Sequence, residues 1–95
     1  MGMFSDHCSI NWKGAQIEVE ARSRGLAGIQ YDLVIDNRRV DRLEGSHGKF
    51  RLRGEIQNVQ NLPPTSVVVE VHQGFFGTKF FLLDGDQLIK MQKII

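Results

Sequence analysis

The chain has 95 residues, of which 41% are hydrophobic and 24% charged, and its formal net charge is +1. This length and composition predict one folded globular domain with a modest core. Because the net charge is small, the chain as a whole has no strong electrostatic field that would attract nucleic acid or a membrane. Apolar runs reach about four to six residues, against roughly 20 for a helix that spans a bilayer, so no membrane span is expected. Cys8 is the only cysteine, which excludes an internal disulfide framework. No signal peptide is visible, and we expect a cytoplasmic protein.

Alternation of apolar and polar side chains with period two predicts short strands separated by turn residues. We expect eight of them, over residues 7–12, 17–22, 29–35, 38–43, 50–56, 67–71, 79–83 and 88–94. Asp36-Asn37 and Asp84-Gly85 are dipeptides typical of tight hairpin turns. Gly54 falls at an inward position, which predicts a bulge or a close approach of another chain segment. Trp12 and Tyr31 are expected in the core, with their polar atoms reaching a partner. The fold class predicted is an all-β antiparallel sandwich.

The sequence contains an internal repeat of a strand, a glycine-bearing loop, a second strand and a tight turn into a third. Its copies are residues 17–40 and 69–88. A repeat of this kind indicates a domain built from two similar hairpin units. We therefore expect one sandwich domain over residues 1–95, with halves at about 7–56 and 66–95 and a linker at about 57–65. Because Pro63 and Pro64 cannot donate hydrogen bonds to a ladder, we expect this linker to cross between the sheets or the halves.

Residues 15–40 carry a resemblance to a known family. The stretch Leu33-Val34-Ile35-Asp36-Asn37-Arg38, preceded by Gly28-Ile29 and by Ile17-Glu18-Val19, resembles the C-terminal domain of the Fas apoptosis inhibitory molecule family. That resemblance implies a compact β-sandwich without a known catalytic centre. It also implies a function carried out through other proteins, namely protection against cell death and against protein aggregation. The chain is half the two-domain length of that family, so the fold transfers more safely than the role in cell death.

Motifs for catalysis or metal binding are weak. In Asp6-His7-Cys8, neighbouring residues on a strand point to opposite faces, so His7 and Cys8 would not converge on one ion. The histidines His7, His47 and His72 are scattered, without a nucleophile motif beside them. Glu18 and Glu20 share a strand face, where cross-strand pairs with Arg51 and Arg53 are expected rather than acid–base chemistry. We expect no enzyme, no catalytic residues, no metal and no cofactor. A hydrolase or small-ligand binder would need a deep pocket that contains His72 and a carboxylate.

Two segments are candidates for partner binding. Residues 38–53 are basic, and on adjacent antiparallel strands their arginines would form one positive patch for phosphates or an acidic partner. The alternative for these strands is protection from edge-to-edge aggregation by charge. Between Gly74 and Gly77, two phenylalanines would form an apolar tip if exposed, and would otherwise fold back onto the sandwich. The predicted binding residues are Arg38, Arg39, Arg42, Arg51, Arg53, Phe75 and Phe76.

The functional prediction is a non-enzymatic domain that binds a partner protein through this basic strand surface. The alternative is a small β-barrel that binds nucleic acid or another polyanion through the same arginines. Only polyanion binding should weaken steeply and log-linearly with ionic strength. We expect a monomer or a weak homodimer.

Overall fold

The computed structural model describes residues 5–23, 28–45, 48–57, 63–74 and 77–94. Within these ranges the chain forms nine strands and no helix. The strands are β1 (Ser5–Trp12), β2 (Ala15–Ser23), β3 (Ile29–Ile35), β4 (Arg38–Gly45), β5 (Gly48–Ile56), β6 (Thr65–Gln73), β7 (Thr78–Asp84), β8 (Gln87–Lys90) and β9 (Gln92–Ile94). The prediction of an all-β antiparallel fold is confirmed.

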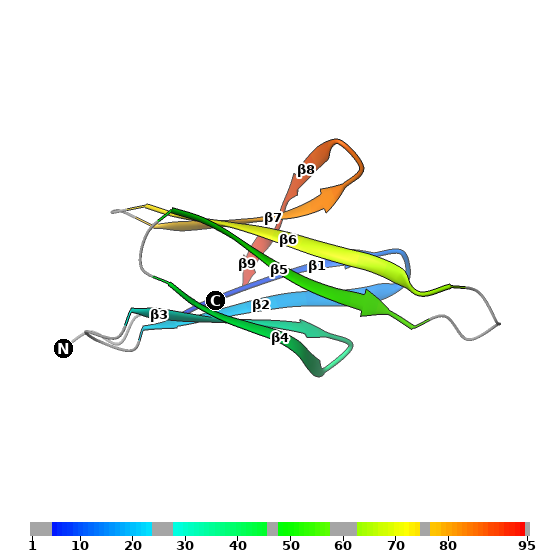
Figure 1. Ribbon diagram of the computed structural model, residues 1–95, viewed down its shortest axis with the longest axis horizontal. Helices are drawn as coiled ribbons and strands as arrows, with labels where there is room; N and C mark the ends of the chain where they lie inside the picture. Colours follow the sequence, from blue (N-terminus) through cyan, green and yellow to red (C-terminus); the bar gives the residue numbers. More distant parts are fainter. Residues whose placement is uncertain (1–4, 24–27, 46–47, 58–62, 75–76, 95) are drawn as a thin grey trace.

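Each of the two sheets is built around a four-stranded meander. The first sheet has the strand order β4-β3-β2-β1-β9, and the second has the order β5-β6-β7-β8. The two sheets pack as a sandwich around one core (Figure 1). The repeated segments, residues 17–40 and 69–88, fall on β2, β3 and the start of β4, and on β6, β7 and β8. The sequence repeat therefore corresponds to one three-stranded unit in each layer.

Two-residue turns join β3 to β4 and β7 to β8. Asp36 and Asn37 have φ angles of 48° and 68°, the left-handed values that such residues tolerate in a two-residue hairpin turn. The second predicted turn is shifted by one residue, because Asp84 still belongs to β7 and the turn residues are Gly85 and Asp86. Gly85 has a φ of 62°, so the glycine occupies the first central position of the turn.

One continuous core fills the space between the sheets. Tyr31 and Phe80 are its largest side chains, and their rings meet edge to face at 6.3 Å. The Tyr31 hydroxyl donates to Gln73 Oε1 at 2.6 Å, which confirms the prediction of a core tyrosine with a hydrogen-bonded hydroxyl. Trp12 lies half-buried at the margin of the core. The remaining buried apolar residues are Cys8, Ala15, Ile17, Val19, Ala21, Leu33, Ile35, Leu52, Ile56, Val67, Val69, Val71, Leu82 and Met91.

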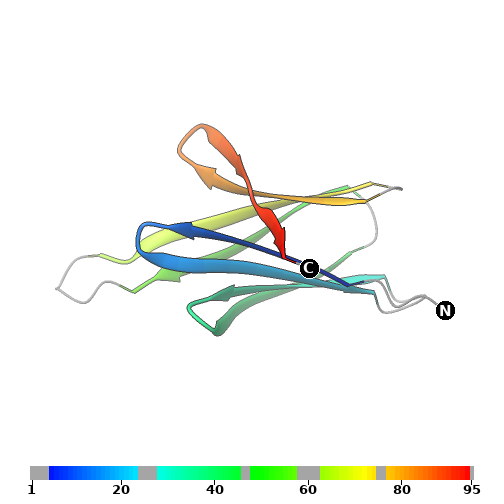
Figure 2. The ribbon, with the colours of Figure 1, turned by 180° about the vertical axis from the view of Figure 1, so that it is seen from behind.

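The predicted last strand, residues 88–94, is divided between the two sheets. β8 pairs with β7, whereas β9 pairs with β1 of the first sheet. Between them Met91 is buried, and its N–H donates to the Phe80 carbonyl at 2.9 Å. Figure 2 shows the red end of the chain crossing from one sheet to the other at this point. Local alternation does not reveal the crossing, because the backbone stays extended on both sides of it.

The segment of residues 57–65, predicted to cross between the sheets or the halves, does not cross between the sheets. It joins β5 to β6, which are paired neighbours in the second sheet. The crossing from the first sheet to the second occurs instead between β4 and β5, after Gly45 and before Gly48. A short connection is sufficient there because β4 and β5 form neighbouring edges of the two sheets.

The edges formed by β4 and β5 are held together at two points. Asp41 on β4 accepts the N–H of Arg53 on β5 at 2.8 Å through Oδ2, and the N–H of Arg42 at 2.9 Å through Oδ1. Gly54 provides the second point, because a Cβ atom at this position would lie 2.6 Å from Val40 Cγ2. The close approach predicted at Gly54 is confirmed, and the register of β5 with β6 runs through it without a bulge.

Candidate functional site

The cationic side chains of residues 38–53 are divided between two faces of the sandwich. The single patch that we expected requires β4 and β5 to pair, but they belong to different sheets. Arg39 and Arg42 both lie on the outer face of the first sheet, opposite Val34 and Asp32, because a register shift between Leu33 and Val34 interrupts the alternation of β4. Arg38 is the first residue of β4. Arg51 and Arg53 lie on the outer face of the second sheet.

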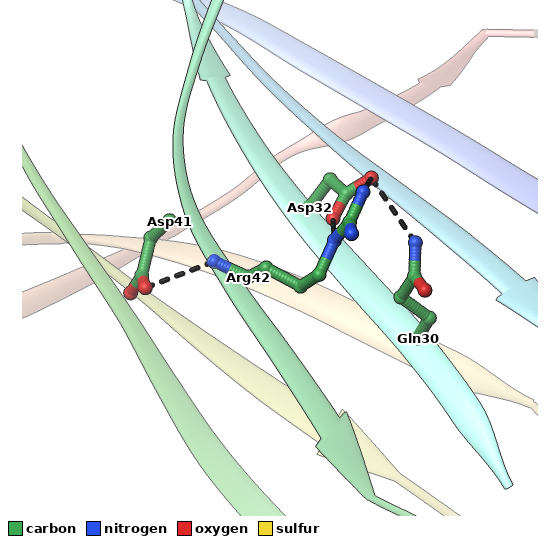
Figure 3. Close-up of polar contacts among 4 residues, drawn as sticks. All are labelled: Gln30, Asp32, Asp41 and Arg42. Atoms are coloured by element: carbon green, nitrogen blue, oxygen red, sulfur yellow. Dashed lines mark hydrogen bonds and ion pairs between the residues drawn. The ribbon is translucent and has the colours of Figure 1, made fainter. Parts of the chain in front are cut away.

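On the first sheet, Arg42 is engaged in a structural ion pair. Its Nε donates to Asp32 Oδ1 at 2.8 Å, and Gln30 Nε2 lies 3.4 Å from Asp32 Oδ2 (Figure 3). Burial acts to raise the pKa of Asp32, but the hydrogen bond and charge of Arg42, with help from Gln30, outweigh it and leave that pKa below its usual value. Arg42 is therefore committed to a neighbouring carboxylate and is less suited to binding a partner.

The outer face of the second sheet is the more basic surface. We call it the basic face and define it by Arg51, Arg53, Glu70, Phe81 and Leu88, which point away from the core on β5 to β8. Leu88 is 45% exposed, an unusual degree for a large apolar side chain. Arg51, Glu70, Phe81 and Lys90 follow one another in register across the four strands. The other charged residues of this face are Lys49, Lys79 and Glu55.

At the centre of the basic face, a single carboxylate holds its neighbours in place. Glu70 Oε1 lies 2.7 Å from His72 Nε2, and Glu70 Oε2 lies 3.4 Å from the Arg51 guanidinium. The hydrogen bond from His72 and the charges of His72 and Arg51 lower the pKa of Glu70, against the opposing effect of burial. The His72 ring packs 4.7 Å from the Phe81 ring, centre to centre. Arg51 therefore shares Glu70 with His72, whereas the Arg53 guanidinium forms no ion pair with any residue that the structure describes.

Sequence reasoning missed the contribution of Phe81 and His72 to this face. The run Phe80-Phe81-Leu82-Leu83 is apolar throughout, yet Phe81 is only half-buried. Alternation within β7 buries Phe80 and Leu82 and turns Phe81 to the other face, but only the strand register places Phe81 beside Glu70. β7 thus adds an aromatic side chain to the face that carries Arg51 and Arg53.

The predicted pairing of Glu18 and Glu20 with Arg51 and Arg53 is wrong. The two glutamates lie on β2 of the first sheet, and Glu18 Oε1 is 2.8 Å from His7 Nε2. Arginines of the second sheet cannot pair with them across the sandwich. The predicted binding residues Phe75 and Phe76 lie outside the described residues.

A cavity of about 1230 Å³ opens where β5 begins, β6 ends and β7 begins, and it extends to the junction of β8 with β9. We call it the lysine cavity and define it by the basic side chains that line it, which are Lys49, His72, Lys79, Lys90 and Lys93. His72 brings its Glu70 partner to the margin of this cavity. No serine or cysteine is among the described lining residues, and the Thr78 hydroxyl is occupied by Gln73 at 2.5 Å.

The segment Asp6-His7-Cys8 is arranged as strand geometry requires. Cys8 points into the core, whereas His7 points outward to Glu18. Burial, and to a smaller extent the charge of Asp6, raise the pKa of the Cys8 thiol, which favours its unreactive protonated form. Over the described ranges, no three histidine, cysteine, aspartate or glutamate side chains come together as a metal site.

No family model, curated protein or solved structure matches the chain. In the described part of the chain, no helix has the length and apolar character needed to cross a membrane. The functional argument therefore depends on the surfaces of the sandwich themselves.

Proposed function

We propose that this chain is a non-catalytic interaction domain that binds an acidic segment of a partner protein across the basic face. One observation carries the proposal: Arg51 and Arg53 stand on the same sheet face as the half-buried Phe81 ring, and Arg53 forms no ion pair with any residue that the structure describes. Arginine binds carboxylates with paired hydrogen bonds, and arginine and aromatic side chains dominate the energetics of protein interfaces. Leu88 adds an apolar contact beside them.

The resemblance to the Fas apoptosis inhibitory molecule family supports a protein as the partner. The residues that carry this resemblance, 15–40, lie on β2, β3 and the start of β4 of the first sheet. The basic face lies on the other sheet, so the proposal places binding on the part of the chain outside the resemblance. Under this proposal the first sheet provides a scaffold and the second sheet provides specificity.

A second candidate, binding of nucleic acid or another polyanion, is favoured by the same combination of cations with an aromatic ring. Ionic strength separates the two functions. Polyanion binding that releases counterions should weaken log-linearly as salt rises, with a slope set by the number of phosphates contacted. A protein segment that also contacts Phe81 and Leu88 should keep part of its binding affinity at high salt, because salt does not screen the apolar contacts.

The decisive experiment compares two charge reversals of equal size. Arg51→Glu with Arg53→Glu alters the basic face, and Arg38→Glu with Arg39→Glu makes the same change at the edge of the first sheet. Partners are identified by cross-linking to the wild-type chain, and their affinities for all three proteins are then measured. We expect the first double variant to lose about tenfold or more in affinity and the second to stay within about twofold. Equal losses, or no loss in either variant, would refute the basic face as the binding surface.

A further inference from the structure

The lysine cavity is formed by a departure of the chain from the second sheet. β8 covers β7 only from Phe81 to Asp84, and after Lys90 the chain turns away toward β1 (Figure 2). The edge of β7 near Thr78 is consequently not covered by β8, and the cavity opens beside it. The fold thereby brings lysines from β5, β7, β8 and β9 to one hollow, although they lie far apart in the sequence.

The positive charge of this cavity is only partly compensated. Lys93 is held by Asp6 at 3.4 Å, and His72 is bonded to Glu70. Lys49, Lys79 and Lys90 form no ion pair with any residue that the structure describes. No aspartate or glutamate is among the described residues that line the cavity.

Three lysines without an acidic partner repel one another, and an anion that enters between them relieves this repulsion. Lysine is suited to phosphate oxygens because its ammonium group offers three donors on a flexible stem. The basic side chains of this hollow come from four strands, more than a single phosphate contacts. An anion with several adjacent phosphoryl groups would contact lysines from more than one strand at the same time.

We infer that the lysine cavity binds a small, soluble anion that carries two or more adjacent phosphoryl groups. Lys49, Lys79 and Lys90 belong to both the cavity and the basic face, whereas Arg51 and Arg53 do not line the cavity, so replacing these two arginines tests partner binding without altering the cavity. The ligand sits between β7 and the β8–β9 junction, with Lys79 and Lys90 as its principal contacts and Lys49 at the far side.

The test uses the full chain and tripolyphosphate as the probe, at an ionic strength of about 0.15 M so that weak surface attraction is screened. Binding is measured by calorimetry, and its location by amide chemical shifts in NMR spectra. Lys79→Gln with Lys90→Gln removes two positive charges from the cavity. Arg51→Gln with Arg53→Gln removes two from the basic face and is the matched control. Inorganic phosphate is titrated in parallel.

We expect tripolyphosphate to bind at least about tenfold more tightly than inorganic phosphate, because a charge-assisted hydrogen bond to a further lysine supports a gain of that size. The affinity of the cavity variant for tripolyphosphate should be about tenfold or more below that of the wild type, while the affinity of the matched control stays within about twofold of the wild type. Shifted amides should include Thr78, Lys79 and the residues from Lys90 to Lys93. Equal weakening in both variants, shifts spread over both sheets, or no saturable binding would overturn the inference. Because the partner assay is separate, loss of partner binding alone would leave this result unaffected.

Discussion

Gly54 offers the sharpest test of how the two sheets close against each other. A methyl group at this position would lie 2.6 Å from Val40 Cγ2 and 3.1 Å from Ile35 Cδ1, whereas ordinary carbon contacts begin at 3.4 Å. Gly54→Ala therefore requires β4 and β5 to separate or the two aliphatic side chains to leave their preferred rotamers. Overpacking of this kind costs about 1–3 kcal/mol. The reduced freedom of the unfolded chain offsets about 0.4–1 kcal/mol, so we expect a net destabilisation of about 1–2 kcal/mol.

A second substitution tests whether Val40 is the cause. In a Val40→Ala background the space for the new methyl group exists, so Gly54→Ala should cost about 1 kcal/mol less than it does in the wild type. Gly74→Ala is the matched control, because its added Cβ would lie at an ordinary 3.7 Å from the Gly77 carbonyl oxygen. We expect this control to change stability by less than about 0.5 kcal/mol.

The free energy of unfolding of each variant is obtained from urea titrations followed by circular dichroism and by the fluorescence of Trp12, the only tryptophan. Coincident curves from the two probes establish a single transition. The reasoning is refuted if Gly54→Ala leaves stability within about 0.5 kcal/mol of the wild type. It is also refuted if the cost of Gly54→Ala is the same with and without Val40, because the strain would then lie elsewhere.

Three further predictions concern polar contacts of the sandwich. Asp41→Ala should lower the free energy of unfolding by about 1–2 kcal/mol in urea titrations, because the N–H groups of Arg42 and Arg53 lose a carboxylate acceptor. Asp32 has a lowered pKa, so its contribution is present above its unfolded pKa of about 3.8 and is lost as pH falls through the folded pKa. Asp32→Asn should therefore flatten the acid side of the stability profile, and an unchanged profile would contradict this. Tyr31→Phe removes a hydrogen bond of 2.6 Å and should cost about 0.5–1.5 kcal/mol, measured by thermal unfolding, without exposing the core.

Much of the fold could be predicted because strand alternation and turn chemistry are local properties. The burial of Val67, Val69 and Val71 follows from period-two alternation alone. The positive φ angles at Asp36 and Asn37 follow from the tolerance of these two residue types for the left-handed region. The repeat likewise indicated two equivalent units, and each forms three neighbouring strands of one sheet.

The candidate sites were less predictable because they depend on which strands become neighbours. Arg42 and Arg51 are close in sequence but lie on opposite faces of the sandwich, since the chain changes sheets between them. Phe81 joins Arg51 on one face only through the register of β5, β6 and β7. No local pattern contains that register information.

The sequence by itself determined that this chain forms short antiparallel strands around one apolar face in each of two similar units, because side-chain alternation decides which residues can be buried. The tertiary structure decided where the strands change sheets, at the β4–β5 connection and at Met91. Those two crossings depend on long-range packing, on the hydrogen bond of Asp41 between the edges of the two sheets, and on the bond from Met91 to Phe80 where β8 leaves β7. They separate the arginines into two surfaces and open the lysine cavity, so the surfaces that carry the proposed functions arise only when the sheets assemble.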